Sequence, residues 1–216
     1  MSGCTTISER ERKLLTRLVD QERLQQSREW LAERANSFFA DRTSIDKGQP
    51  WCWKEPNTHV VIERILALRP ELRYIHVVRH PLDVALSGNQ SQLQNWGPIF
   101  LNRDVAVEPR LSLSYWCAAH RRIMNVMRCW PEHTLMIDFD ALCATPESYC
   151  LRIARFLGVK LPDDELSKII GFIRRPGSAR RFGTADIAQF DPDDLAYVVE
   201  IGYSLTPRKA AACDGD

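Results

Sequence analysis

The fold class is decided by one stretch of the sequence, Leu72-Arg73-Tyr74-Ile75-His76-Val77-Val78-Arg79-His80-Pro81-Leu82-Asp83. Its first seven residues are rich in β-branched and aromatic side chains, a composition that predicts a strand. Proline is favoured at the first position of a helix, so a helix is expected to begin directly after His80. The chain therefore changes from strand to helix at Arg79, and His76 inside the strand is interpreted as a core histidine.

Further elements are expected on both sides of this stretch. A second strand is predicted over residues 134–139, and Trp51-Cys52-Trp53 is a candidate short strand. Periodic apolar residues and capping signals predict helices over residues 57–68, 111–130, 145–157, 163–172 and 191–204, and one or two amphipathic helices over 7–39. Strands that alternate with helices predict an α/β fold with a parallel sheet, in which ligands bind beyond the carboxyl ends of the strands.

The composition argues against several classes of protein. The 29 basic residues nearly cancel the 28 acidic ones, and a net charge of +1 gives no support for a general nucleic-acid binder. The seven cysteines form no CxxC pair, which argues against a zinc site or a disulfide framework. No apolar run reaches the ~20 residues of a transmembrane helix and the N-terminus does not resemble a signal peptide, so a cytoplasmic location is expected.

Arg79 lies where the first strand is expected to end, and Ser87 lies about two turns into the helix that follows. A guanidinium group can donate two parallel hydrogen bonds to a phosphate, and a helix N-terminus adds free N–H groups. Ser87 would donate a further hydrogen bond, and Asp83 could orient the guanidinium. The alternative interpretation is a structural ion pair between Arg79 and Asp83, with no ligand.

A second segment, Lys54-Glu55-Pro56-Asn57-Thr58-His59, contains two candidates for chemistry. Pro56 favours an extended Glu55 and the start of a helix, which places Lys54 beside a helix N-terminus, another position that favours anions. His59 is a candidate general base because its unperturbed pKa lies near neutrality. Each has a simpler interpretation, with Lys54 as a solvated side chain and His59 as a polar contact in the first helical turn.

A third segment, Arg174-Arg175-Pro176-Gly177-Ser178-Ala179-Arg180-Arg181, follows the helix expected over residues 163–172. Its proline and glycine argue against a stable helix interior. The four arginines around Gly177 and Ser178 are interpreted either as a loop that binds an anion or as a solvated basic turn. A nucleic-acid site would need aromatic or further basic residues, which the flanks lack.

Together these segments resemble the sulfotransferase family. Residues 74–87 look like the strand and helix that bind the 3'-phosphate of the nucleotide, and Lys54-Glu55-Pro56 looks like the Lys-acid-Pro motif of the tyrosylprotein sulfotransferase branch. The arginine-rich segment occupies the place of the family's late nucleotide loop. The family's acidic turn and the helix after it are similar to Phe139-Asp140-Ala141-Leu142, Thr145-Pro146-Glu147 and Phe156-Leu157-Gly158.

The resemblance implies a P-loop-NTPase-like α/β fold and transfer of a sulfuryl group from 3'-phosphoadenosine 5'-phosphosulfate to a hydroxyl or amine acceptor, with no metal. Lys54 would stabilise charge on the oxygen that bridges the sulfate and the 5'-phosphate. Such a transfer depends on positioning and charge neutralisation, as phosphoryl transfer does. The resemblance assigns the nucleotide contacts to Arg79, Ser87, Ser178, Arg180 and Arg181.

The front of the chain departs from the family's pattern. The family opens with a strand and a glycine-rich loop that holds the 5'-phosphosulfate, and Ser2-Gly3-Cys4-Thr5-Thr6 matches that loop only in part. We therefore expect the first strand to be absent and the loop to be absent or degenerate. Catalysis by a sulfotransferase is one hypothesis, and a truncated or non-catalytic nucleotide-binding domain of the same fold is the alternative.

The length of 216 residues suits one domain. We expect a sulfotransferase-like domain over residues 1–206, with a helical N-terminal part (1–50), a nucleotide-binding core (51–181) and a C-terminal helix (182–206), followed by a disordered tail over 207–216. The expected partners are the nucleotide donor and an acceptor of unknown class, without nucleic acid or a transmembrane segment. A homodimer is left open.

Overall fold

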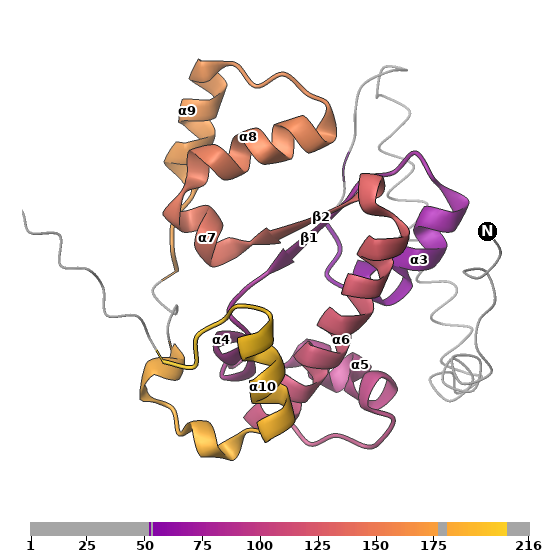
Figure 1. Ribbon diagram of the computed structural model, residues 1–216, viewed down its shortest axis with the longest axis vertical. Helices are drawn as coiled ribbons and strands as arrows, with labels where there is room; N and C mark the ends of the chain where they lie inside the picture. The colour runs from indigo at the N-terminus through magenta and orange to yellow at the C-terminus, as the bar shows by residue number, and fades with distance from the viewer. Residues whose placement is uncertain (1–51, 53, 177–180, 207–216) are drawn as a thin grey trace, which may run out of the picture. The chain divides into compact units, whose positions relative to one another are not determined.

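A computed structural model describes Cys52, residues 54–176 and residues 181–206 of the chain (Figure 1). The chain divides into two units, residues 1–56 and residues 57–216. In the first unit the described residues belong to no helix or strand. All the described helices and strands therefore lie in the second unit.

Two parallel strands form the sheet of the described part, β1 (Tyr74–Val78) and β2 (Thr134–Asp138). Their register pairs Tyr74 with Thr134 and Val78 with Asp138, so the two strands end level at the same edge. The α/β class and the parallel pairing are as predicted. Both strands lie inside the ranges that their β-branched composition indicated.

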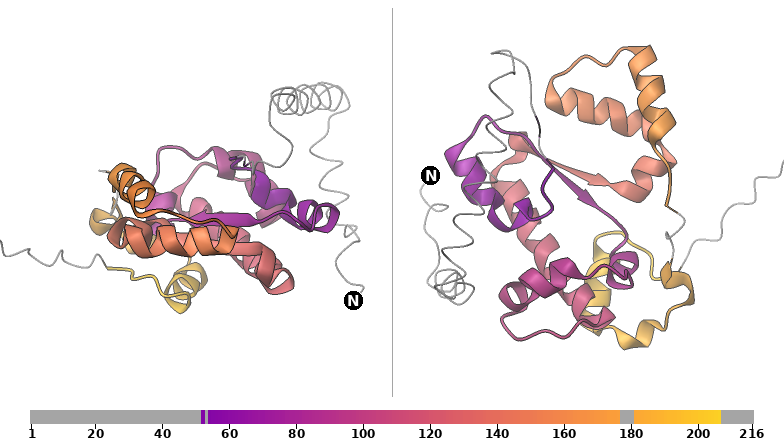
Figure 2. Two further views of the ribbon diagram at one scale, coloured as in Figure 1. Left: turned by 90° about the horizontal axis from the view of Figure 1, so that it is seen from above. Right: turned by 180° about the vertical axis from the view of Figure 1, so that it is seen from behind.

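Helices connect β1 to β2, namely α4 (Pro81–Ala85), α5 (Ser91–Leu101), α6 (Pro109–Cys129) and the short 3-10 helix η2 (Pro131–His133). The long helix α6 runs beside the sheet, as two views show (Figure 2). It packs against α4, α5, α3 (Thr58–Leu68) and α10 (Pro192–Glu200). Because it touches elements from both ends of this unit, α6 fixes the position of α4 next to the end of β1.

The chain after β2 forms α7 (Phe139–Ala144), α8 (Pro146–Leu157), α9 (Asp163–Phe172), the 3-10 helices η3 (Arg181–Thr184) and η4 (Ile187–Gln189), and then α10. Asp138 ends the strand and caps α7, because its Oδ1 accepts a hydrogen bond from the N–H of Ala141 at 2.8 Å. Gly158 ends α8 with a φ of 69°, in the left-handed region that favours glycine.

Helix α4 is shorter than the sequence indicated. It has five residues and ends at Ala85, so Ser87 lies beyond the helix and the expectation of a place two turns inside it is wrong. The cause is Gln90, whose Nε2 donates to the carbonyl oxygens of Val84, Ala85 and Ser87 at 3.2, 3.1 and 2.6 Å. These bonds occupy the carbonyl groups that a longer helix would use. A helix this short also contributes little dipole charge to an anion.

Two helices and one cap differ from the expectation. The sequence pattern does not predict α5 or α7. Within α5, a Cβ atom at Gly97 would lie 2.8 Å from Leu93 Cδ1 and 3.0 Å from Val105 Cγ2, so this glycine serves close packing inside a helix. Thr145 makes no side-chain cap for α8, because its hydroxyl donates back to the carbonyl oxygen of Ala141 at 3.2 Å.

Several expectations lie outside the described residues. They are the helices over 7–39, the tail over 207–216 and most of the candidate strand at 51–53, of which Cys52 alone is described. None of the helices in the described ranges is both long and apolar enough to cross a membrane.

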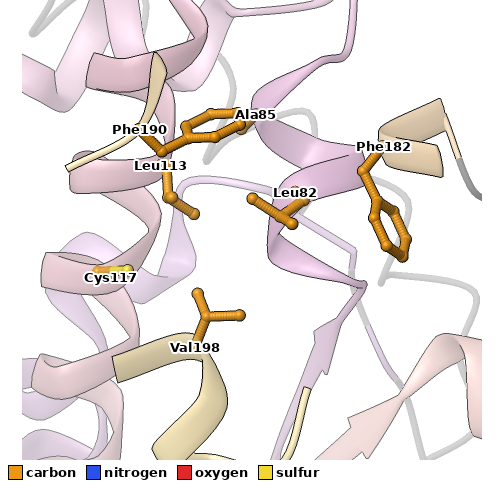
Figure 3. Packing of buried hydrophobic residues seen from close by; sticks show 7 residues of the cluster. All are labelled: Leu82, Ala85, Leu113, Cys117, Phe182, Phe190 and Val198. Carbon is orange, nitrogen blue, oxygen red and sulfur yellow. The ribbon is translucent and has the colours of Figure 1, made fainter. Parts of the chain in front are cut away.

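A cluster of buried apolar side chains surrounds α4 (Figure 3). It joins α4 and α6 to the segment that follows residue 181. Its buried members are Leu82, Ala85, Leu113, Cys117, Phe182, Phe190 and Val198. Full burial of one such leucine contributes about 1.5–3 kcal/mol. The cluster therefore holds α4, and the backbone that leaves β1, against the C-terminal elements.

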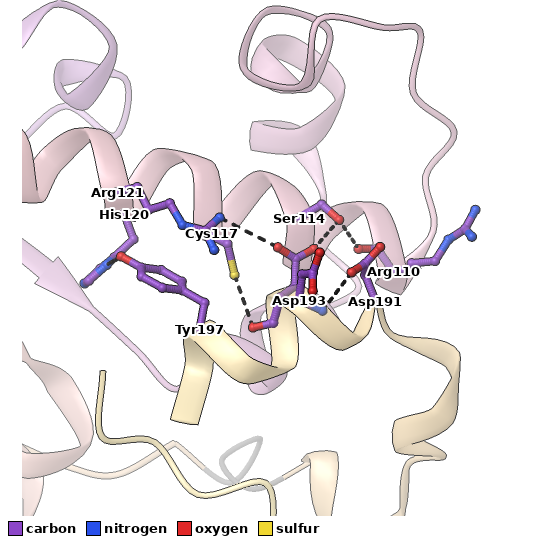
Figure 4. Close-up of polar contacts among 9 residues, drawn as sticks. Arg110, Ser114, Cys117, His120, Arg121, Asp191, Asp193 and Tyr197 are labelled. Atoms are coloured by element: carbon purple, nitrogen blue, oxygen red, sulfur yellow. Dashed lines mark hydrogen bonds and ion pairs between the residues drawn. The ribbon is translucent and has the colours of Figure 1, made fainter. Parts of the chain in front are cut away.

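A polar network joins α6 to α10 (Figure 4). The buried Asp194 accepts a hydrogen bond from the hydroxyl of Ser114 at 2.5 Å and lies 3.9 Å from Arg121 Nη1. His120 Nδ1 lies 2.8 Å from the hydroxyl of Tyr197, and the Arg121 guanidinium lies 3.9 Å from the centre of the Tyr197 ring. The polar groups of this interface are thus paired inside the protein.

Candidate functional site

The level ends of β1 and β2 bring four residues together. Arg79 and His80 follow β1, Phe139 and Asp140 follow β2, and the register places the two pairs side by side. We refer to these four residues as the carboxyl edge. Ligands of parallel sheets bind at the carboxyl ends of strands, so the position predicted for Arg79 is the position where a ligand site is expected.

Arg79 lies at this edge with an incomplete set of partners. Its guanidinium carbon is 5.7 Å from the centre of the Phe139 ring, and its Nε is buried without a hydrogen-bond partner among the described residues. No ion pair joins it to Asp83 or to another described carboxylate. The alternative of a structural Arg79–Asp83 pair is therefore wrong. A buried cationic donor without a partner fits a site for an anion.

Asp83 serves the fold in another way. It is 4% exposed on α4, and its Oδ1 accepts a hydrogen bond from the backbone N–H of Phe182 at 3.4 Å. The expectation that Asp83 orients the Arg79 guanidinium is not supported, because α4 directs this carboxylate toward η3. Asp83 thus anchors the chain just after the arginine-rich segment.

His80 joins the carboxyl edge to the C-terminal part of the chain. Its ring stacks on Phe182 with centres 4.0 Å apart, and its Nε2 lies 3.0 Å from the carbonyl oxygen of Ser204. A carbonyl oxygen only accepts, so Nε2 carries the proton. Burial lowers the pKa of His80, partly offset by the Ser204 carbonyl and nearby aspartates, so the ring is neutral at pH 7. Its buried Nδ1 then presents a lone pair that has no partner among the described residues.

Two aspartates hold further segments at this edge. Asp140 Oδ2 accepts a hydrogen bond from the backbone N–H of His80 at 3.2 Å, and its Oδ1 lies 3.5 Å from Arg175 Nη2. Asp138 Oδ2 accepts a hydrogen bond from the hydroxyl of Tyr203 at 2.6 Å. The chain on both sides of residues 177–180 therefore contacts the carboxyl edge, at Arg175 through Asp140 and at Phe182 through the ring of His80.

Ser87 lies half-buried just after α4. Its Oγ accepts a hydrogen bond from the backbone N–H of Asn89 at 3.3 Å, which leaves the hydroxyl proton to donate elsewhere. Gln90 holds the Ser87 carbonyl, and its own Oε1 accepts a hydrogen bond from Ser112 on α6 at 2.6 Å. The position of Ser87 is thus set by a side chain that connects it to α6.

The guanidinium of Arg79, with a buried donor that has no partner among the described residues, is a group that can bind an anion. Ser87, beyond α4, has a hydroxyl proton to donate. Within the described ranges, no group of three or more His, Cys, Asp or Glu side chains has an arrangement that could hold a metal ion.

A sequence model of the sulfotransferase family matches residues 5–163, well over half of the chain. The chain belongs to the sulfotransferase family. No curated protein and no solved structure matches it. The family match includes both strands and the positions of Lys54, His59, Arg79 and Ser87, and it ends at the first residue of α9.

The two catalytic candidates of this sulfotransferase-family chain lie in different units. Lys54 is exposed in the first unit, and its catalytic role stays a prediction. His59 lies in α3, is 8% exposed, and its Nε2 is 2.8 Å from the hydroxyl of Tyr115. Burial raises the pKa of Tyr115, which keeps that hydroxyl protonated. This is the environment of a structural histidine, and the role of His59 as a general base stays a prediction.

The late loop of the family corresponds to residues that are described in part. Ser178 and Arg180 lie outside the described residues, and Arg181 is the first residue of η3, with a side chain that also lies outside the description. Their assignment as nucleotide contacts stays a prediction. What the structure adds is the contact of two flanking residues with the carboxyl edge, Arg175 with Asp140 and Phe182 with His80.

Sequence reasoning missed three residues of this site, His80, Asp140 and Gln90. His80 and Asp140 stand inside the two motifs that carry the family resemblance, so their positions were visible, but their contacts were not. The His80–Ser204 contact spans 124 positions and the Arg175–Asp140 contact spans 35. Local patterns carry no signal for contacts at such separations.

Proposed function

We propose that this protein is a sulfotransferase that binds 3'-phosphoadenosine 5'-phosphosulfate at the carboxyl edge and transfers its sulfuryl group to a hydroxyl or amine acceptor. The bond between sulfur and the oxygen of the 5'-phosphate breaks, and a new bond forms between sulfur and the acceptor atom. The acceptor gives up one proton, and adenosine 3',5'-bisphosphate is the leaving group. Family membership supports the reaction class, and the donor and the acceptor class are our proposal.

The observation that carries the proposal is the buried Nε of Arg79, which lacks a partner among the described residues at the carboxyl end of a parallel strand. A charged donor buried in this way is stabilised when an anion accepts from it, and a phosphate matches the planar guanidinium with two parallel hydrogen bonds. Ser87 has a hydroxyl proton to donate and follows the same strand–helix unit. Both support a site for the 3'-phosphate.

Further residues are assigned to the nucleotide by position. Ser178, Arg180 and Arg181 are assigned by their place in the sequence, between Arg175 and Phe182, which contact Asp140 and His80 of the carboxyl edge. Those two contacts support the assignment. Lys54 is assigned to the reacting end, where a positive charge stabilises the oxygen that becomes negative as the sulfuryl group leaves.

Calorimetry with two nucleotides tests the binding part of the proposal. Adenosine 3',5'-bisphosphate is expected to bind better than adenosine 5'-monophosphate, because Arg79 addresses the 3'-phosphate. Loss of a charge-assisted hydrogen bond is worth ~1.5–3 kcal/mol, so Arg79→Ala should weaken bisphosphate binding about tenfold or more. Arg110→Ala is the matched control, since Arg110 is an exposed arginine at the start of α6 and 4.0 Å from Glu108.

Equal affinity for the two nucleotides would sink the assignment of the 3'-phosphate. Tight, selective binding without sulfuryl transfer to any hydroxyl or amine tested would favour the alternative, a non-catalytic nucleotide-binding domain. The two measurements therefore separate the binding part of the proposal from the catalytic part.

Lys54→Ala tests the catalytic part. Because its charge is needed mainly when the bridging oxygen becomes negative, kcat should fall about 100-fold or more while the Kd for the bisphosphate changes little. Lys160→Ala, at an exposed lysine between α8 and α9, is the control. A collapse of nucleotide affinity with kcat unchanged would make Lys54 a ground-state anchor.

A further inference from the structure

Asp140 stands between a cation and a backbone donor at the carboxyl edge. Its Oδ2 accepts from the N–H of His80 at 3.2 Å, and its Oδ1 faces Nη2 of Arg175 at 3.5 Å. The two oxygens of one carboxylate thus have separate tasks. One holds the backbone directly after Arg79, and the other holds a guanidinium of the arginine-rich segment.

The contact to Arg175 is the weaker of the two tasks. Its length of 3.5 Å exceeds that of a typical charge-assisted hydrogen bond, which is about 2.7–2.9 Å. The side chains are 41% exposed for Arg175 and 20% exposed for Asp140, and ion pairs this open to water contribute little stability. Arg175 therefore lies near the edge, and Asp140 is the one partner of its guanidinium among the described residues.

Arg175 and Arg79 each contact one of the two residues that follow β2: Arg175 contacts Asp140, and Arg79 contacts the ring of Phe139. The thiol of Cys143, on α7, is within the electrostatic reach of both arginines and of Asp140. Burial raises the pKa of Cys143 and so does Asp140, whereas Arg175 and Arg79 lower it. The observed contacts are that of Arg175 with Asp140 and that of Arg79 with the Phe139 ring, which stands next to Asp140 in the chain.

We propose that Asp140 is a built-in counter-ion that holds Arg175 at the carboxyl edge in the free protein and yields it to a phosphate group of the bound nucleotide. The inference rests on the proposed function, because it needs a phosphate at this edge. A phosphate carries more charge than a carboxylate and accepts two parallel bonds from a guanidinium, so it displaces a 3.5 Å contact. Asp140 keeps the N–H of His80 throughout and leaves the strand end in place.

Asp140 then sets the affinity of the site. While its carboxylate pairs with Arg175 it competes with the phosphate, and its negative charge repels the incoming anion. The expected result of neutralising Asp140 is therefore tighter nucleotide binding, which is the opposite of the result for a residue that only builds the site.

Asp140→Asn separates the two tasks. The amide oxygen still accepts from the N–H of His80, while the amide nitrogen cannot pair with Arg175. Calorimetry with adenosine 3',5'-bisphosphate should show Asp140→Asn binding about threefold to fivefold tighter than the unmodified protein, and Arg175→Ala about tenfold weaker. In the double variant the gain from Asp140→Asn should shrink to less than about twofold, because no guanidinium remains to be released. Arg175→Lys should recover part of the lost affinity.

Asp164→Asn is the matched control, since Asp164 pairs with Lys168 at 3.3 Å on the surface of α9. It should leave the Kd unchanged, and thermal unfolding checks that each variant is folded. Weaker nucleotide binding by Asp140→Asn would overturn the proposal that Arg175 passes from Asp140 to a phosphate. So would an equal gain in affinity with and without Arg175. In both cases the proposed function stands. An unmodified protein that does not bind the bisphosphate overturns both.

Discussion

The α6–α10 interface and the carboxyl edge are both built from charged and aromatic side chains, but they differ in how completely their polar groups are paired. At the interface Asp194 accepts from Ser114, and His120 bonds to Tyr197. At the edge the buried Arg79 Nε and the buried His80 Nδ1 have no partner among the described residues. An unpaired buried group costs about 1–3 kcal/mol, so adjacent examples support the ligand site that we propose at this edge.

Because of this difference, we expect the interface to determine the free energy of unfolding and the edge to determine nucleotide affinity. The interface has its partners already, so changes there should lower the free energy of unfolding and leave the nucleotide Kd alone. At the edge, a donor on Arg79 and an acceptor on His80 lack partners among the described residues. Changes there should therefore alter the nucleotide Kd and leave the free energy of unfolding nearly unchanged. The core beneath α4 supports both regions, and changes there should affect both.

The largest effect is expected from Leu82→Ala, which removes a fully buried side chain from the cluster around α4. The free energy of unfolding should fall by about 2–5 kcal/mol, measured by urea denaturation. Nucleotide affinity should fall as well, because α4 supports the backbone that carries Arg79. Leu151→Ala, at a position 41% exposed on α8, is the control and should change unfolding by less than about 0.5 kcal/mol.

Acid should destabilise the fold by nearly as much. Burial lowers the pKa of His76 to about 4, with smaller contributions from His59 and His120, and its Nδ1 lies 2.8 Å from the hydroxyl of Tyr74. Between pH 6.5 and 4 the unfolded chain binds a proton that the folded chain does not. Stability is therefore fully present above pH 6.5 and should decrease by about 3 kcal/mol as the pH falls to 4.

Urea denaturation at several pH values measures this slope. His76→Gln should flatten it, because the titrating group is gone, and His133→Gln is the control. An unfolding free energy that stays level from about pH 6.5 to about pH 4.5 in the unmodified protein would contradict the role of His76.

Asp194→Ala is expected to act on the interface alone. It leaves the hydroxyl of Ser114 without its acceptor and removes a charge 3.9 Å from Arg121, so the free energy of unfolding should fall by about 2 kcal/mol. Asp193→Ala, at an exposed position on the same helix, should have little effect. A change of more than about twofold in the bisphosphate Kd for Asp194→Ala would mean that the two regions are coupled.

The smallest effects are expected from two serines, Ser87 after α4 and Ser114 at the α6–α10 interface. A neutral hydrogen bond is worth about 0.5–1.5 kcal/mol. Ser87→Ala should therefore weaken bisphosphate binding about threefold with unfolding unchanged, and Ser114→Ala should lower the free energy of unfolding by about 1 kcal/mol with binding unchanged. Calorimetry measures the Kd of both variants, and urea denaturation measures their free energy of unfolding. If both variants changed the same quantity, the proposed difference between the two regions would be wrong.

The part of the site that depends on local sequence is predictable. A β-branched run predicts the strand and the proline after His80 predicts the change to helix, so the sequence alone places Arg79 at the strand end. Thr134–Asp138 is predicted in the same way. The edge where the two strands end follows from their parallel pairing.

The rest depends on side chains that meet across the fold. The sequence pattern places Ser87 inside a helix, because nothing local announces that Gln90 takes the carbonyl groups of α4. Spacing assigns Asp83 to Arg79, whereas its observed partner is Phe182, 99 positions away. Residue type makes His59 a candidate base, whereas Tyr115, 56 positions away, gives it a structural bond.

The bond between His80 and Ser204 joins residues 124 positions apart, which gives the protein an order of assembly during its synthesis. At ~5–20 residues per second, several seconds pass between the emergence of Arg79 and that of Ser204 from the ribosome. Throughout that interval His80, at the end of β1, lacks its hydrogen bond to Ser204. A ligand that binds only the completed edge adds stability only after Ser204 has reached His80. The proposed nucleotide would then stabilise the finished fold and contribute nothing to the folding of the partly synthesised chain.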